Sequence, residues 1–331
     1  MHEPRAVIGD QLGPPDNYRL VPHDPGQPGS GQVRIRVMAA GVSFADVLVA
    51  GGKYQLQPPT PFIPGSEYAG IVEAVGAGVT RFQTGDRVMA GGMGNAFNEC
   101  AVMDERSVHP APESLSFAEA ACFRSSFSTS YHALVDRAQL QQGETLVVLA
   151  AGGAVGYAAI QIGKAMGARV IGSASGEATR ALALKAGADA VIDSKSPTWR
   201  DDLKAANDGK PVDVVLDPVG GDMTELGLRS LAWNGRILVV GFMAGIPAIR
   251  TNLALLKGAS IIGVDIRQFG IYEPEKAASN LAALFNMQAQ AGLKPAVTKS
   301  YPIEQFADAM NAVAGGGVAG RLVITMKQEA Q

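Results

Sequence analysis

An uncharged stretch near the middle of the chain constrains the fold more than any other feature. Residues 146–149 are apolar, Gly152 and Gly153 follow them, and an apolar segment of helical period leads to a β-favouring run at 169–173. This order of strand, tight turn, helix and strand predicts a βαβ unit with glycines in its first turn. The glycines and the short first run argue against a membrane span of the same length.

The chain shows two different sequence patterns along its length, and 331 residues suit two domains. The first third is rich in Gly and Pro, with short alternating runs at 32–39 and 70–75, which is typical of an irregular β domain. Apolar runs then alternate with helical periods, which predicts a doubly wound α/β sheet. We expect its six strands at 146–150, 169–173, 190–193, 212–217, 236–241 and 260–264. A helix to about residue 290, a strand near 297, a helix from 304 and a strand at 321–326 follow.

Composition excludes several classes of protein. Apolar residues make up 47% of the chain, charged residues 18%, and the net charge is -3, which indicates a globular protein without the basic surplus of a nucleic-acid binder. Only Cys100 and Cys122 are present, too few for a disulfide framework. The first residues do not resemble a signal peptide. We therefore expect a cytoplasmic protein with neither nucleic-acid nor membrane partners.

The glycine turn predicts a phosphate site. Gly153 and Gly156 lie between a strand and a helix, where backbone N–H groups and the helix dipole favour an anion and a Cβ would block its approach. Two positions depart from the usual dinucleotide fingerprint, because Ala150 replaces its first glycine and Ala154 stands where a glycine is common. Two interpretations stay open at this point, pyrophosphate binding and a turn needed only for packing.

The end of the second strand bears on which dinucleotide binds. An NAD site usually carries an acid there for the ribose hydroxyls, whereas this chain has Ala174. A 2′-phosphate would meet no like charge, and Ser175, Thr179 and Arg180 could donate to it. We therefore expect NADPH rather than NADH. The alternative for Arg180 is a solvated helix residue.

Several motifs together resemble one protein family. They are the block 41–79 with GDRV at 85–88, FSTSYHAL at 127–134, the glycine turn, DPVGG at 217–221, RILVVGF at 236–242 and GRLVIT at 320–325. This set resembles the medium-chain dehydrogenase/reductase superfamily, in its zinc-independent quinone oxidoreductase branch related to ζ-crystallin. The resemblance implies a Rossmann dinucleotide-binding domain at 124–265 and an irregular β-rich, GroES-like catalytic domain made of 1–123 and 266–331.

The resemblance also implies site residues. Positions that hold the catalytic zinc in related alcohol dehydrogenases match Ser43, Ser66 and Ser125 here, and hydroxyls are poor zinc ligands, so no metal is expected. Tyr54 matches a tyrosine beside the nicotinamide, where it would donate a hydrogen bond or a proton, although a packing role stays open. The substrate pocket would include Ser43, Tyr54, Ile266 and Arg267. The cofactor would be bound by Ser43, Thr129, Gly153, Ala154, Val155, Ser173, Ser175, Arg180, Val219, Gly241, Phe242 and Arg321.

The function that follows is transfer of hydride from NADPH to a quinone or another α,β-unsaturated carbonyl, an electrophilic small molecule, without a metal. One alternative is an enoyl-thioester or acryloyl-CoA reductase, which the same branch resembles. A second is an NADPH-binding protein with little turnover. The resemblance further implies a homodimer joined through the β-rich run at 260–264, which would otherwise leave an apolar edge exposed.

Overall fold

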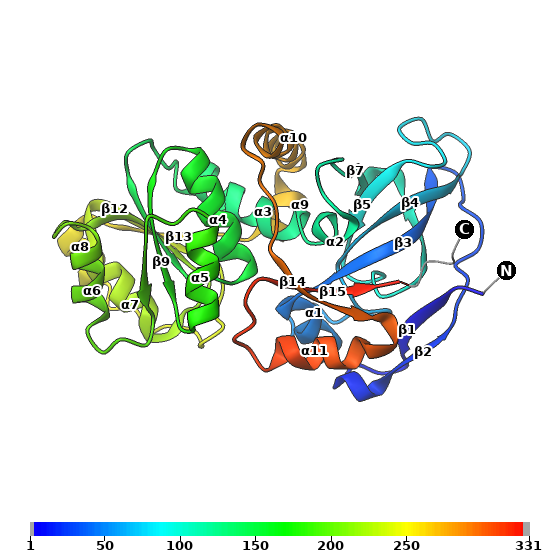
Figure 1. Ribbon diagram of the computed structural model, residues 1–331, viewed down its shortest axis with the longest axis horizontal. Coiled ribbons are helices and arrows are strands. Elements are labelled where there is room, and N and C mark those ends of the chain that lie inside the picture. The colour runs from blue at the N-terminus through cyan, green and yellow to red at the C-terminus, as the bar shows by residue number, and fades with distance from the viewer. Residues whose placement is uncertain (1–2, 327–331) are drawn as a thin grey trace. The chain divides into compact units, whose positions relative to one another are not determined.

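The computed structural model describes residues 3–326 and divides into two compact units (Figure 1). Unit 1 comprises Met1–Arg124 and Val297–Gln331, and unit 2 comprises Ser125–Ala296. The first boundary lies next to the expected one at 123/124. The second differs, because residues 266–296 belong to unit 2 and not, as expected, to the β-rich domain.

Contacts within unit 2 explain the second boundary. Asn280 donates a short hydrogen bond to Asp136, and the ring of His132 stacks on Phe269 with centroids 3.9 Å apart. Gln161 also donates to the backbone carbonyl of Lys294 at 3.0 Å. Because these partners are far apart in the chain, the sequence pattern did not reveal that the segment after the sixth strand stays with the nucleotide unit.

Unit 2 contains the expected doubly wound sheet. Its six strands are parallel, in the order β10-β9-β8-β11-β12-β13. All six predicted strands are confirmed, although the fifth begins earlier than expected. Their bounds are β8 (Thr145–Leu149), β9 (Arg169–Ala174), β10 (Ala190–Asp193), β11 (Val212–Asp217), β12 (Leu231–Val239) and β13 (Ser260–Gly263).

Helices cover both faces of this sheet. Figure 1 shows α4 and α5 along one face and α6, α7 and α8 along the other. Trp199, Leu203, Leu228 and Leu253 of the second group share a buried cluster with the strands. The helices of unit 2 are α3 (Arg124–Tyr131, whose first residue belongs to unit 1), a π-helical turn (His132–Arg137), α4 (Ala154–Ala165), α5 (Glu177–Lys185), α6 (Trp199–Ala206), α7 (Gly221–Ser230), α8 (Asn252–Lys257), α9 (Ile266–Tyr272) and α10 (Pro274–Ala291).

Unit 1 is built on β structure, as the turn-rich first third predicts. A two-stranded sheet pairs β1 with β2, and a larger sheet runs β14-β15-β3-β4-β5-β7, with β6 also paired to β3. The expected runs at 32–39 and 70–75 lie within β3 and β4. The strands are β1 (Arg5–Gly9), β2 (Tyr18–Pro22), β3 (Gln32–Val42), β4 (Glu67–Val75), β5 (Arg87–Gly91), β6 (Cys100–Asp104), β7 (Val108–Pro110), β14 (Val297–Pro302) and β15 (Arg321–Thr325).

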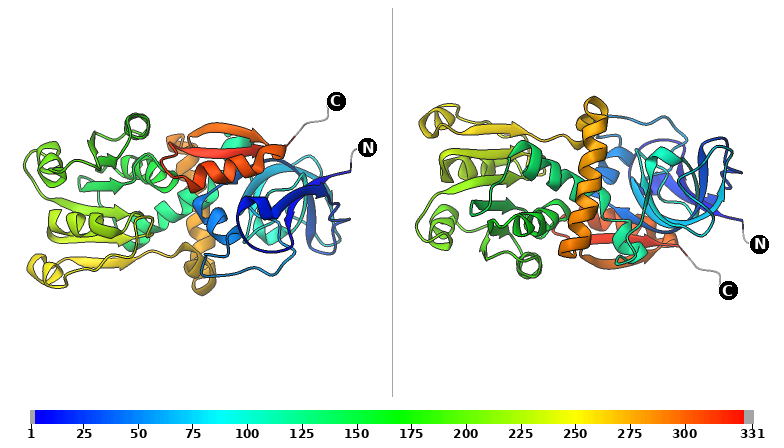
Figure 2. Two further views of the ribbon diagram at one scale, coloured as in Figure 1. Left: turned by 90° about the horizontal axis from the view of Figure 1, so that it is seen from below. Right: turned by 90° about the horizontal axis from the view of Figure 1, so that it is seen from above.

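The last segment of the chain completes the core of unit 1. Figure 2 shows α11 lying against β14 and β15, and Phe306 and Met310 of this helix are buried in the same cluster as Ile35 and Tyr68. The helices are α1 (Phe44–Ala50), α2 (Phe117–Ala120) and α11 (Phe306–Ala314), with 3-10 turns at Pro15–Asn17, Glu105–Ser107 and Ile303–Gln305. The return of the chain to the β-rich unit therefore begins at β14.

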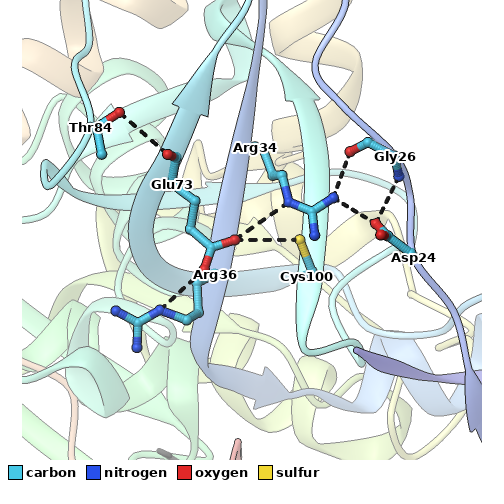
Figure 3. Close-up of polar contacts among 7 residues, drawn as sticks. All are labelled: Asp24, Gly26, Arg34, Arg36, Glu73, Thr84 and Cys100. Atoms are coloured by element: carbon cyan, nitrogen blue, oxygen red, sulfur yellow. Dashed lines mark hydrogen bonds and ion pairs between the residues drawn. The ribbon is translucent and has the colours of Figure 1, made fainter. Parts of the chain in front are cut away.

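A polar network ties three segments of unit 1 together (Figure 3). Arg34 on β3 donates to Asp24 and to the backbone oxygen of Gly26, both at 2.6 Å. Its Nε also donates to Glu73 on β4 at 3.4 Å, and Arg36 approaches the same carboxylate at 3.3 Å. The guanidinium of Arg34 thus holds the loop before β3 against the sheet.

Across residues 3–326, none of the helices is both long enough and apolar enough to cross a bilayer.

Candidate functional site

The glycine turn of unit 2 leaves the start of α4 open. Gly153 caps this helix without a side-chain hydrogen bond, so the first amides have no side-chain acceptor there. A Cβ on Gly156 would lie 2.4 Å from the carbonyl oxygen of Ala150, so glycine is required for close packing of turn and helix. Ala150 itself has φ of +49°, a left-handed conformation that favours glycine. The turn therefore has the shape of the usual fingerprint, including at the position where the residue departs from it.

Two neighbouring predicted residues, Ala154 and Val155, form the first turn of α4. The Val155 carbonyl accepts a hydrogen bond from Ser130 on α3 at 2.9 Å, which fixes α3 beside the helix start. The hydroxyl of the predicted cofactor residue Thr129 donates to the Ser125 carbonyl within the same helix at 2.8 Å. The Ser130 hydrogen bond therefore joins α3 to α4 on the nucleotide unit, whereas the Thr129 bond lies within α3.

The end of β9 carries the predicted selectivity residues. Ala174 is buried in the last position of the strand, and Ser175 is exposed directly after it. Ser173 is fully buried, and its hydroxyl accepts a hydrogen bond from the indole nitrogen of Trp199 at 2.8 Å. Ser173 therefore faces the core of the sheet, whereas Ser175 lies at the surface. Thr179 caps α5 through two hydrogen bonds with the backbone of Gly176.

Arg180 on α5 has an acidic neighbour that the sequence analysis missed. Its Nη1 lies 3.0 Å from Oδ2 of Asp193, the last residue of β10. The two atoms do not meet in hydrogen-bonding geometry, and within residues 3–326 this buried nitrogen has no hydrogen-bond acceptor. Asp193 pairs in register with Ala174 on the adjacent strand. The sequence signal for this contact was an acid, Asp193, at the end of the third predicted strand.

The ends of β11 and β12 complete the same edge of the sheet. The buried carboxylate of Asp217 accepts hydrogen bonds from the backbone N–H of Val219 and of Gly220, at 2.8 and 2.9 Å. Gly220 has φ of +74°, and a Cβ there would lie 2.4 Å from a backbone oxygen. Gly241 and Phe242 follow β12, and the Phe242 ring is exposed. The glycine turn and the ends of β9, β11 and β12 thus gather at the carboxyl edge, where doubly wound sheets bind ligands.

In unit 1, two of the three serines that match zinc-ligand positions of related alcohol dehydrogenases share one carboxylate. Ser43 caps α1, and its hydroxyl donates to Asp46 at 2.7 Å while accepting from the Asp46 amide. Ser66 also hydrogen-bonds to Asp46. Burial raises the pKa of the Asp46 carboxyl, although these hydrogen bonds act in the opposite direction. The sequence signal for this arrangement was the capping box that begins at Ser43.

Arg321, predicted to contact the cofactor, has a partner inside unit 1. Its Nη2 donates to Glu67 at 3.0 Å, and the two side chains are 5% and 4% exposed. The guanidinium also lies beside Gly41, where a Cβ would approach Nη2 to 2.7 Å. The structure therefore assigns Arg321 to a buried ion pair, which sequence reasoning missed because its partner lies 254 positions away.

Tyr54 is half-buried and lines a small cavity of unit 1. The cavity has a volume of about 40 Å³ and is also lined by Asp46, Ser66, Phe62 and Met93. Such a space holds a few waters or one polar group. It brings Tyr54 close to the carboxylate that Ser43 and Ser66 share.

The two remaining predicted substrate residues belong to unit 2. Ile266 and Arg267 begin α9, whose N-cap is Asp265, and the Arg267 amide donates to the Asp265 carboxylate at 3.0 Å. The structure therefore gathers Ser43 and Tyr54 on unit 1 and the other pair on unit 2.

Two family models match the chain. An alcohol dehydrogenase GroES-like domain matches residues 29–131, and a zinc-binding dehydrogenase domain matches residues 154–283. Together they match a large part of each unit and leave out β1, β2, β8, β14 and β15. The first corresponds to the β structure of unit 1 and the second to the parallel sheet of unit 2.

Known proteins resemble the chain over nearly its full length. It is 35% identical to "Quinone oxidoreductase-like protein 2 homolog" of Nematostella vectensis, over 98% of this chain and 89% of that one. A probable oxidoreductase from Mycobacterium abscessus is 33% identical with a TM-score of 0.87, covering 97% and 99% of the two chains. The CurK enoyl reductase is 25% identical with a TM-score of 0.88, covering 98% and 100%. The chain therefore belongs to the medium-chain dehydrogenase/reductase family of oxidoreductases, in its quinone oxidoreductase branch, which uses a nicotinamide cofactor.

Proposed function

We propose that this protein is an NADPH-dependent reductase of quinones or other α,β-unsaturated carbonyls that acts without a metal ion. The observation that supports the cofactor assignment is Nη1 of Arg180, which is ion-paired with Asp193 at 3.0 Å but has no hydrogen-bond acceptor in the described part of the chain. A 2′-phosphate would supply the acceptor. Ala174 adds no charge that would repel it, whereas Asp193 on the neighbouring strand competes with it for Arg180.

The carboxyl edge of unit 2 suits the rest of the dinucleotide. The uncapped start of α4 offers amides to a pyrophosphate, and Gly153 adds no side chain in its way. The turn held by Asp217 places Gly220 and Gly241 at the neighbouring strand ends. When bound, a nicotinamide cofactor supplies a hydride to an electron-poor carbon. The residues of this chain would bind and orient it.

The metal-free part of the proposal rests on the hydroxyls of unit 1. Ser43 and Ser66 both form hydrogen bonds with Asp46. A neutral hydroxyl is a poorer ligand for Zn²⁺ than a thiolate or an imidazole. Within residues 3–326 no group of three or more His, Cys, Asp and Glu residues has the arrangement of a metal site. The protein should therefore keep its activity after dialysis against a chelator.

Tyr54 is the proposed hydrogen-bond donor to the substrate. Tyr54 lines the same cavity as Asp46, so a carbonyl oxygen at the mouth of this cavity could accept a hydrogen bond from the Tyr54 hydroxyl. The Asp46 carboxylate, which is hydrogen-bonded to Ser43 and Ser66, lines the same cavity.

The enoyl-thioester reductase stays as the second candidate because the CurK enoyl reductase shares the fold and 25% of the sequence. The two reactions make different demands on Tyr54. Reduction of an enoyl thioester leaves charge on an oxygen and requires a proton at carbon, whereas a quinone ring stabilises its own charge.

The deciding experiment is an acceptor panel of quinones, enals and enoyl-CoAs, measured with NADPH and with NADH. We expect NADPH-dependent reduction of quinones or enones. Activity confined to enoyl-CoAs would select the second candidate. NADPH binding without reduction of any acceptor would instead indicate a binding protein with little turnover.

A titration tests the cofactor preference. NADPH should bind at least about tenfold more tightly than NADH, equivalent to about 1.4 kcal/mol. Arg180→Ala should remove most of this difference, whereas Lys185→Ala, an exposed cation on the same helix, should not. Equal or stronger binding of NADH by the unaltered protein would reject NADPH selectivity.

Tyr54→Phe separates the two reactions. With an enoyl thioester, kcat should fall by about 10²-fold, as for loss of a positioned acid. With a quinone, KM should change more than kcat, by less than about tenfold. Tyr272→Phe, at a largely exposed tyrosine, is the matched control. Unchanged kcat and KM would make Tyr54 a packing residue.

We also propose a homodimer and a cytoplasmic location. β13 is the outer strand of the parallel sheet, and Ile261 on it is exposed, so a second copy of this chain could pair there and cover the edge. Cys100 and Cys122 are buried and form no disulfide in the described structure, which suits a reducing compartment.

A further inference from the structure

A second cavity lies on unit 2, far from the glycine turn. It has a volume of about 420 Å³ and is formed by α6, the loop before β11 and the ends of α7 and α8. This size is within the range of small-molecule sites in proteins. Its charged lining residues are Arg200, Lys204, Lys210, Arg229, Lys257 and Asp201.

The cavity lies at the amino ends of the strands, and the proposed cofactor site lies at their carboxyl ends. Val212, in the lining, begins β11, while Asp217 at the other end of that strand shapes the turn described above. A strand of six residues spans about 20 Å. A ligand in this cavity would therefore not be the bound dinucleotide.

Few of the positively charged lining residues form ion pairs with acidic residues of the described structure. Among the described residues, ion pairs of the lining involve only Arg229, whose guanidinium lies 2.7 Å from Glu225. Lys204 and Lys210 are exposed and form no ion pair in the described structure. Asp201, the acid of the lining, lies three positions before Lys204 on α6 but is not within ion-pair distance of it.

Local helix chemistry adds to this imbalance. Arg200 and Lys204 are four positions apart on α6, a spacing at which like charges destabilise a helix. Nearby acids have other partners, since Asp208 pairs with Arg169 at 3.7 Å and Asp213 accepts from the Thr145 amide at 2.8 Å. Among the described residues, no acid forms an ion pair with Arg200 or Lys204, although Asp201 and Asp202 lie on the same helix.

Lys257 at the end of α8 adds a partly buried cation. Its Nζ donates to the backbone oxygen of Leu231 at 2.6 Å, which points the ammonium at the amino end of β12. Burial, and secondarily the charge of Arg200, lower the pKa of Lys257. A nearby anion would offset both effects.

We propose that this cavity binds a small polyanion of the polyphosphate class, at a site separate from the cofactor edge. Several cations around one concavity suit a ligand with at least two negative groups, and lysines and arginines are the usual partners of phosphate oxygens. All residues of this cavity belong to unit 2, and binding there would not depend on the proposed reductase activity.

Isothermal titration of the full chain with inorganic tripolyphosphate tests the site. The unaltered protein should bind one equivalent with a dissociation constant below ~1 mM at low salt, and added salt should weaken binding. The double variant Lys204→Gln/Lys210→Gln should raise the dissociation constant at least tenfold. The control Lys185→Gln/Lys294→Gln removes the same charge from exposed lysines elsewhere on unit 2 and should change it less than twofold.

An Arg180→Gln variant distinguishes the two edges of the sheet. Binding lost in this variant but kept in Lys204→Gln/Lys210→Gln would place the probe at the cofactor edge and overturn the proposal. Equal weakening in both double variants would indicate nonspecific attraction and would also overturn it, as would absence of binding by the unaltered protein. Because both lining lysines are exposed and Lys204 repels Arg200 on α6, their replacement should not lower the thermal midpoint of the free protein.

Discussion

Replacing Arg321 by methionine should destabilise unit 1 strongly. The change keeps most of the side-chain volume but leaves Glu67, 4% exposed and 3.0 Å from the lost guanidinium, without that charge partner. Asp46 is also 4% exposed, and its charge interacts with Arg321, so the variant loses the cation that both carboxylates share. Removing one member of a buried ion pair typically costs about 3–5 kcal/mol.

The assay is urea unfolding followed by fluorescence, with the free energy of unfolding obtained from midpoint and slope. We expect a loss of about 3–5 kcal/mol, a large share of the ~5–15 kcal/mol that stabilises a typical protein. The double variant Glu67→Gln/Arg321→Met should recover a substantial part, because it removes the buried charge as well. A loss below about 1 kcal/mol, or a double variant no more stable than the single one, would refute the reasoning.

Four further predictions follow from individual residues. Ala150→Gly should raise the free energy of unfolding by about 0.5–1 kcal/mol in the same assay, because release of a left-handed alanine outweighs the added flexibility of the unfolded chain, and a loss would contradict this. Burial, with smaller effects of Arg124 and Arg81, lowers the pKa of His109 from 6.5 to about 4, so the unfolded chain binds a proton in that interval and the folded chain does not. Stability should therefore fall as the pH falls from 6.5 to 4, by up to about 3 kcal/mol, and His109→Gln should flatten this dependence in unfolding curves measured across the interval. Asp193→Asn should strengthen NADPH binding by about 2- to 5-fold by releasing Arg180 from a partly exposed ion pair, and fluorescence titration showing weaker binding would count against it. Ile261→Glu should convert the proposed dimer to a monomer by sedimentation, and an unchanged mass would exclude pairing through β13.

Most of the architecture could be read from local patterns. Apolar runs punctuated by glycine predicted all six parallel strands of unit 2, and short alternating runs predicted the β structure of unit 1. The glycine turn was located although Ala150 departs from the fingerprint, because strand, turn and helix occur in the right order around it. These features depend on the chemistry of residues close together in the chain, which is why the sequence alone determines them.

The partners of individual side chains were decided by the tertiary structure. Arg321 looked like a cofactor residue from its motif, yet it pairs with Glu67 on another strand. Ser173 was expected to bind the cofactor, yet its hydroxyl accepts a hydrogen bond from Trp199, and Asp193 reaches Arg180 from a neighbouring strand.

The same limit applies to larger features. The segment 266–296 joined unit 2 through contacts with residues that precede it by more than a hundred positions. The basic cavity forms where α6, α7 and α8 meet, although their lysines and arginines are scattered along the sequence without a cluster. Local propensity specifies a strand or a helix, but the charges that face each other depend on which elements the fold brings together, and only the folded chain decides that.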